Sequence, residues 1–75
     1  MSAIKQIVGD RVKRLRIAKK WTQPVLAKRS GFDESYIGVL ERGQANPSLS
    51  TIVALAEVLD VEPYELLRDS ESNVD

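Results

Sequence analysis

Hydrophobic residues recur at intervals of three and four along most of this chain, which is the spacing of α-helices that bury one face. Gly and Pro residues separate the periodic segments. The pattern predicts an all-α fold of five helices, at about residues 3–19, 23–29, 34–42, 49–59 and 63–68. The two clearest inward stripes are Ile4, Val8, Val12 and Leu15 in the first helix, and Ile52, Leu55, Ala56 and Leu59 in the fourth.

The predicted helix ends carry capping residues. Thr22, Asp33 and Ser48 each stand directly before a helix, where a side-chain oxygen can accept a hydrogen bond from an unpaired backbone N–H. Gly31 and Gly43 stand just past helix ends, where a positive φ is favoured. The second and third helices are therefore joined by a tight turn. This is the geometry of a helix-turn-helix, whose second helix can enter the major groove of DNA.

A series of short motifs extends this pattern over roughly residues 8 to 68. They are Arg14-Leu15-Arg16, Thr22-Gln23, Leu26-Ala27, Ser30-Gly31, Tyr36-Ile37, Leu40-Glu41-Arg42-Gly43 and Asn46-Pro47-Ser48-Leu49, then Thr51-Ile52, Leu55-Ala56, Leu59, Val61 and Leu66-Leu67. No single tripeptide is specific, but chance rarely reproduces so many spacings. On these residues the chain resembles the Cro/repressor-type helix-turn-helix family. The resemblance implies a λ-repressor-like DNA-binding domain at residues 1–68, followed by an acidic tail at 69–75.

The same resemblance implies two sets of DNA contacts, because the start of the recognition helix faces bases and its surroundings face phosphates. Glu34 departs from relatives that have Arg or Gln there. Either its carboxylate accepts from a cytosine amino group, or it only favours the positive end of the helix. Val39 could pack on a thymine methyl. The base set is Glu34, Ser35, Tyr36, Gly38 and Val39, and the phosphate set is Thr22, Gln23, Arg42, Gln44, Asn46 and Ser48.

Two further roles follow from the family. An Arg of the first helix pairs with a Glu near the end of the recognition helix, and Arg16 and Glu41 match those positions. One recognition helix makes few base contacts, so a homodimer reading two half-sites of a palindromic operator is expected. Its interface is expected at the fifth helix, with Val61, Tyr64 and Leu67.

The distribution of charge supports a polyanionic partner better than the total does. The net charge is zero, with a pI near 6.2. Residues 1–42 hold ten basic and four acidic side chains (+6), whereas residues 43–75 hold one basic and seven acidic ones (−6). Arg11, Lys19 and Lys28 are expected to add long-range attraction. The zero total and the Asp33-Glu34 pair keep an alternative open, a protein-interaction module that has lost DNA binding.

Several other classes of function find no support in the sequence. The chain has no Cys and no His, which removes disulfides, thiolate metal sites and the commonest general base. No membrane span, signal peptide, small-molecule site or cofactor motif is recognisable, so a cytoplasmic, non-enzymatic protein is expected.

Overall fold

The computed structural model describes residues 4–69, which form helices and no strand. The all-α class predicted from the periodicity is confirmed. The elements are α1 (Ile4–Ala18), α2 (Gln23–Ser30), α3 (Glu34–Glu41), α4 (Leu49–Leu59) and the 3₁₀ helix η1 (Pro63–Leu67).

The fifth helix of the predicted all-α fold, at residues 63–68, is present but is not an α-helix. It is the five-residue 3₁₀ helix η1, in which the Glu65 N–H donates to the carbonyl of Glu62. A segment this short gains little from the α pattern, and 3₁₀ turns are common in such connecting pieces. Of the predicted acidic tail, only Asp69 lies within the described residues.

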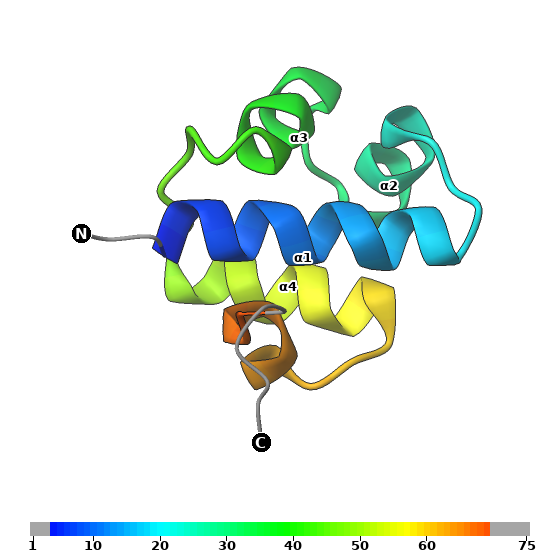
Figure 1. Cartoon of the computed structure of the whole chain (residues 1–75). Helices are drawn as coiled ribbons and strands as arrows, with labels where there is room; N and C mark the ends of the chain where they lie inside the picture. The colour runs from blue at the N-terminus through cyan, green and yellow to red at the C-terminus, as the bar shows by residue number, and fades with distance from the viewer. Residues whose placement is uncertain (1–3, 70–75) are drawn as a thin grey trace.

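Helix α1 runs through the middle of the molecule (Figure 1). Helices α2 and α3 lie on one side of it, and α4 and η1 lie on the other. Each element contributes to one core between these layers. The largest fully enclosed side chains are Val8, Val12, Leu26, Ile37, Leu40, Leu55, Leu59 and Leu66.

The predicted inward stripe of α1 is only partly correct. Val8 and Val12 are completely buried, but Ile4 is 48% exposed because it begins the helix at the edge of the core. At the other end of the stripe, Arg16 is buried one turn after Val12. The predicted stripe of α4 is confirmed in full.

Most of the predicted helix ends are confirmed. Thr22 Oγ1 accepts from the Val25 N–H at 3.3 Å, and Ser48 Oγ accepts from the Thr51 N–H at 3.2 Å. Gly31 has φ +80°, the left-handed conformation that favours glycine. Asp33 is the exception: it occupies the position before α3, but its side chain makes no capping hydrogen bond.

None of the helices within residues 4–69 has the length and apolar character needed to cross a membrane.

Candidate nucleic-acid interface

The α2–turn–α3 unit holds α3 with one face buried and one face open. Leu26 of α2 packs in the same buried cluster as Ile37 and Leu40 of α3. Glu34 and Ser35, on the other face of α3, are exposed. This combination fixes the direction of α3 while leaving its first turn accessible, as a recognition helix requires.

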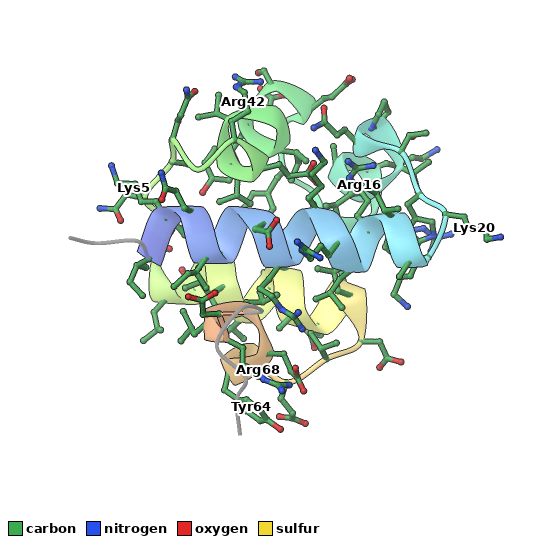
Figure 2. The ribbon with its side chains drawn as sticks, in the orientation of Figure 1. Lys5, Arg16, Lys20, Arg42, Tyr64 and Arg68 are labelled. Carbon is green, nitrogen blue, oxygen red and sulfur yellow. The ribbon has the colours of Figure 1, made fainter. Side chains whose placement is uncertain are left out.

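A shallow depression lies along the open face of α3, on the side of the molecule opposite η1. Figure 2 shows Arg42 at this end and Tyr64 at the far end, with α1 between them. Four of the five residues expected to face bases line it, together with two from the phosphate set. Its lining residues are Gln23, Asp33, Glu34, Ser35, Gly38, Val39 and Arg42.

Tyr36 is the expected base-facing residue that the depression does not include. Its side chain is half-buried, with the ring 5.6 Å from that of Phe32, and it packs against the core. Tyr36 therefore stabilises the turn between α2 and α3 in this structure.

Gly38 forms the floor of the depression. A Cβ at this position would lie 3.4 Å from Arg42 Nη1 and 3.7 Å from Gln23 Oε1, which are ordinary contact distances. The side chains of Gln23 and Arg42 thus border the space above Gly38, and the glycine leaves that space open.

The predicted pair of Arg16 and Glu41 is present, and it is nearly enclosed. Arg16 donates from Nε to Glu41 Oε2 at 2.7 Å and from Nη2 to Oε1 at 2.9 Å, with side chains 10% and 2% exposed. A two-pronged geometry of this kind is the strong form of an Arg–carboxylate contact. It ties α1 to the end of α3.

Two further hydrogen bonds extend this ion pair into a network. Arg16 Nη1 donates to the carbonyl of Trp21 at 2.9 Å, and Gln23 Nε2 donates to Glu41 Oε1 at 3.0 Å. The network therefore links α1, the loop after it, the start of α2 and the end of α3. Sequence reasoning identified the ion pair but not the role of Gln23 in supporting it.

Hydrogen bonding to Glu41 raises the pKa of the Arg16 guanidinium above its ordinary value. Burial opposes this rise and the attraction of the Glu41 charge adds to it. A raised pKa in the folded state means that the stabilisation is complete below the ordinary pKa of an arginine side chain and is lost only as the pH rises above it. Arg16 is therefore charged at every pH at which the protein would be studied.

The start of α2, where Thr22 and Gln23 are expected to contact a phosphate, has few free N–H groups. Pro24 has no N–H, Val25 donates to Thr22 Oγ1 and Leu26 donates to the Thr22 carbonyl. The Gln23 N–H and the Thr22 hydroxyl proton remain as donors toward a phosphate at this helix end.

The remaining predicted phosphate contacts lie in and around the loop after α3. Arg42, Gln44, Asn46 and Ser48 are all exposed. Arg42 Nε donates to Gln44 Oε1 at 3.4 Å, a long hydrogen bond that a phosphate could replace. Ser48 Oγ caps α4 and also lies 3.1 Å from the Ser50 hydroxyl and 3.0 Å from the Thr51 hydroxyl, so a phosphate would compete with these partners for its proton.

Two of the three basic side chains expected to add long-range attraction to DNA make contacts within the protein. Arg11 bonds the carbonyl of Glu65 at 3.1 Å and its carboxylate at 3.6 Å, so it fastens η1 to α1. Lys19 lies 5.4 Å from the centroid of the Trp21 ring, on which Arg29 also lies, at 4.6 Å. These contacts fix the loop between α1 and α2 through cation–π attraction. Lys28 is exposed, as expected.

The residues expected at a dimer interface lie at the opposite end. Tyr64 is 62% exposed and Leu67 is 42% exposed, whereas Val61 is half-buried against the core. Leu49 and Val53 also expose large apolar side chains on α4, which η1 contacts, and sequence reasoning did not single them out.

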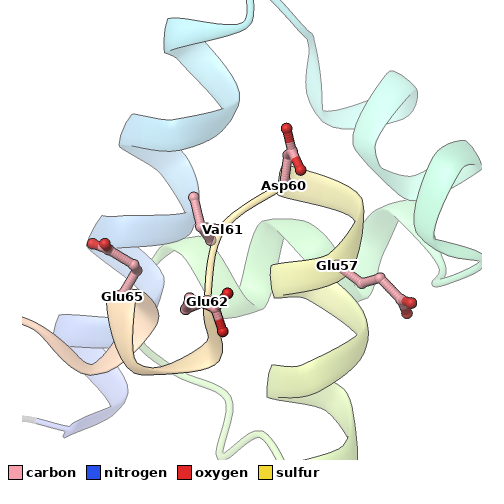
Figure 3. A pocket seen from close by; sticks show the side chains of 5 residues that line it. All are labelled: Glu57, Asp60, Val61, Glu62 and Glu65. Carbon is pink, nitrogen blue, oxygen red and sulfur yellow. The ribbon is translucent and has the colours of Figure 1, made fainter.

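An acidic pocket lies beside η1, between the end of α4 and the turn that follows it (Figure 3). Four of its five lining residues are carboxylates, which accounts for much of the negative charge of the second half of the chain. No arrangement of acids suited to holding a metal ion occurs among residues 4–69. The lining residues are Glu57, Asp60, Val61, Glu62 and Glu65.

Comparison with known proteins places this architecture in a family. The helix-turn-helix model HTH_3 matches residues 12–66. The uncharacterized HTH-type transcriptional regulator y4dJ of Sinorhizobium fredii is 41% identical over 64 residues, covering 85% of this chain and 83% of that protein. Control protein C.SmaI of Serratia marcescens is 38% identical over 64 residues, covering 85% of this chain and 76% of that protein.

A solved structure agrees in both fold and sequence. The restriction–modification controller protein C.AhdI from Aeromonas hydrophila matches with a TM-score of 0.81 and 49% identity, covering 87% of this chain and 98% of that chain. The resemblance inferred from the ordered motifs is thereby confirmed. This chain belongs to the helix-turn-helix family HTH_3, a family of DNA-binding transcriptional regulators.

Proposed function

We propose that this protein is a sequence-specific transcription regulator that binds a palindromic DNA operator as a homodimer. The observation that carries the proposal is the open face of α3. Its first turn is exposed, a depression runs along it, and a buried ion-pair network fixes its direction. Similarity to restriction–modification controller proteins supports a regulatory role of this kind.

The proposed contacts divide into two classes with different consequences. Glu34, Ser35, Gly38 and Val39 face base edges and set sequence preference, with Tyr36 beside them. The others hold phosphates and contribute affinity without sequence information. They are Thr22, Gln23, Arg42, Gln44, Asn46 and Ser48.

The homodimer is proposed from the other end of the molecule. Exposed Tyr64 and Leu67 lie on η1, on the side of α1 away from α3 (Figure 1). A chain of 75 residues has a small core, which benefits from apolar burial between subunits. A symmetric contact there leaves both copies of α3 free to enter successive major grooves about 34 Å apart.

The test is a gel shift with the DNA upstream of the gene, titrated against unrelated DNA of equal length. We expect a complex containing two chains per site that persists in excess unrelated DNA and weakens as salt is raised. The Asp33-Glu34 pair favours one rival, a protein-interaction module, because carboxylates beside the depression repel phosphates. Equal, negligible binding to both DNAs at low salt would support that rival and contradict our proposal.

A further inference from the structure

The side chains that α3 presents restrict which bases the helix can read. Its sequence from Glu34 to Glu41 contains no Arg, Lys, Asn or Gln. These are the residues that form paired hydrogen bonds with guanine or adenine in the major groove. The helix instead presents a carboxylate at Glu34, a hydroxyl at Ser35 and part of an isopropyl group at Val39, while Gly38 between them is buried and adds no side chain.

The nearest strong donors lie outside α3, and each makes one hydrogen bond to another side chain. The amide of Gln23 donates to the buried Glu41, and Nε of Arg42 donates to Gln44. Both side chains border the depression rather than occupy its floor, which is Gly38. Apart from the Ser35 hydroxyl, which can donate or accept, recognition of a base by α3 itself must therefore use acceptors and apolar contact.

Glu34 is available for this role. Its side chain is exposed, and within residues 4–69 it makes no hydrogen bond or ion pair. Asp33 beside it also makes no capping hydrogen bond, so no neighbouring donor neutralises the pair. A carboxylate only accepts hydrogen bonds. Guanine presents two acceptors in the major groove and thymine one, and adenine presents the N7 acceptor beside its N6 amino donor. Cytosine alone presents an amino donor, at N4, with no acceptor beside it to repel a carboxylate.

Val39 and Gly38 supply the apolar part of the surface. Val39 is half-buried: it packs against the core and also lines the depression beside Gly38. The distinctive apolar group in the major groove is the thymine methyl, which side chains of this kind contact. Glu34 and Val39 are five residues apart, which is about 7.5 Å along a helix axis and thus about two base-pair steps.

We propose that α3 reads a cytosine through Glu34 and, within about two base pairs, a thymine methyl through Val39, with guanine rejected opposite Glu34. This inference rests on the proposed function, since it specifies the base chemistry of the same surface. Glu34 and Val39 are then the specificity-determining residues of each half-site.

The experiment selects binding sites from random duplex DNA with the wild type, Glu34→Gln, Glu34→Ala, Val39→Ala and the control Glu57→Gln. Glu57 has the same chemistry but lines the acidic pocket beside η1, away from α3 (Figure 3). We expect the wild type and Glu57→Gln to enrich the same half-site with one invariant cytosine. Glu34→Gln should change that position toward adenine, which Gln pairs with through two hydrogen bonds, and Glu34→Ala should lose the preference.

Affinities for DNA duplexes of known sequence then test the Glu34–cytosine contact and the Val39–methyl contact separately. Replacing the selected C·G pair by G·C should weaken the wild type by roughly tenfold or more, and Glu34→Ala much less. Replacing the thymine by uracil removes only the methyl group; it should weaken the wild type and leave Val39→Ala unchanged. Because Glu34 is exposed, the two Glu34 variants should melt at the wild-type temperature, which circular dichroism checks. Val39→Ala removes some core contact, so its melting curve fixes the temperature at which its DNA binding is measured in the folded state.

The experiment distinguishes a failure of this inference from a failure of the proposed function. If the wild type enriches a clear site but the Glu34 variants select the same base with the same discrimination, this inference is overturned while DNA recognition stands. A guanine selected at the Glu34-dependent position would overturn it equally. If the wild type enriches no sequence at all, the proposed function fails and the inference fails with it.

Discussion

Gly9 of α1 lies directly against the carbonyl oxygen of Leu40 in α3. A Cβ on Gly9 would approach this oxygen to less than 3.0 Å, and it would also crowd the Glu41 carbonyl and the Gly43 N–H, each at 3.1 Å. These neighbours are backbone atoms that no rotamer change can move. Glycine at this position therefore sets how closely the recognition helix packs on α1.

Gly9→Ala should accordingly destabilise the protein. Alanine is the better helix former, but the steric conflict with backbone should outweigh that gain and cost about 2 kcal/mol. In a domain of this size that corresponds to a fall in melting temperature of roughly 8–16 °C. Thermal denaturation followed by circular dichroism measures it. An unchanged melting temperature would show that α3 can shift without penalty.

Gly38→Ala is the matched contrast, since Gly38 is also a buried helical glycine but meets only the side chains of Gln23 and Arg42. We expect folding stability to be unchanged or to rise by up to about 1 kcal/mol, because alanine favours the helix. The added methyl fills the floor of the depression, so affinity for the selected operator should fall. A loss of DNA affinity together with a loss of stability would contradict this prediction.

The contrast between these two glycines shows where sequence reasoning succeeded and where it failed. The helices, most caps and the Arg16–Glu41 pair follow from local patterns and from ordered motifs that the family repeats. The close approach at Gly9 does not, because it depends on the distance between helices that are remote in sequence. The same holds for Arg11, whose charge suggested long-range attraction to DNA but whose side chain bonds Glu65 of η1, 54 residues away.

Breaking the buried pair should destabilise more than removing it entirely. Arg16→Met leaves Glu41 without its main partner in a nearly enclosed site, at a cost of about 3–5 kcal/mol. Arg16→Met combined with Glu41→Leu leaves no uncompensated charge, so it should be less destabilising than Arg16→Met alone and than the sum of the single changes. Urea denaturation of the wild type, of the single variants Arg16→Met and Glu41→Leu, and of the double variant gives the coupling free energy between the two side chains. Strict additivity would show that the two side chains act independently.

Arg42→Ala should weaken binding to all DNA sequences by a similar factor. Its guanidinium is exposed at the edge of the depression, so the loss removes one phosphate contact and should reduce the salt slope of binding by roughly one unit. The control is Arg68→Ala, which makes the same charge change at the far end of the molecule (Figure 2). Equal effects from the two variants would show that Arg42 acts only through the net charge of the protein and makes no phosphate contact of its own.

Gln23→Ala should resemble Arg42→Ala in DNA binding but differ from it in stability. Gln23 donates to Glu41, and a hydrogen bond to a charged group contributes about 1.5–3 kcal/mol. Its loss should lower the melting temperature, whereas Arg42→Ala should not. Parallel melting curves and gel shifts separate the two roles. A normal melting temperature for Gln23→Ala would mean that water replaces the amide at Glu41.

Leu67→Asp should separate subunits without unfolding them. Leu67 is 42% exposed on η1, so an aspartate there remains hydrated in the monomer but faces apolar side chains in the proposed dimer. We expect sedimentation to show a concentration-dependent dimer for the wild type and a monomer for the variant. Operator affinity should fall steeply, because each chain would then read one half-site.

The control is Ile17→Asp, which introduces the same charge at another exposed apolar position, 53% exposed near the end of α1. A wild type that stays monomeric at high micromolar concentration, both free and on DNA, would rule out the homodimer. Dissociation by Ile17→Asp instead would move the interface to the end of α1.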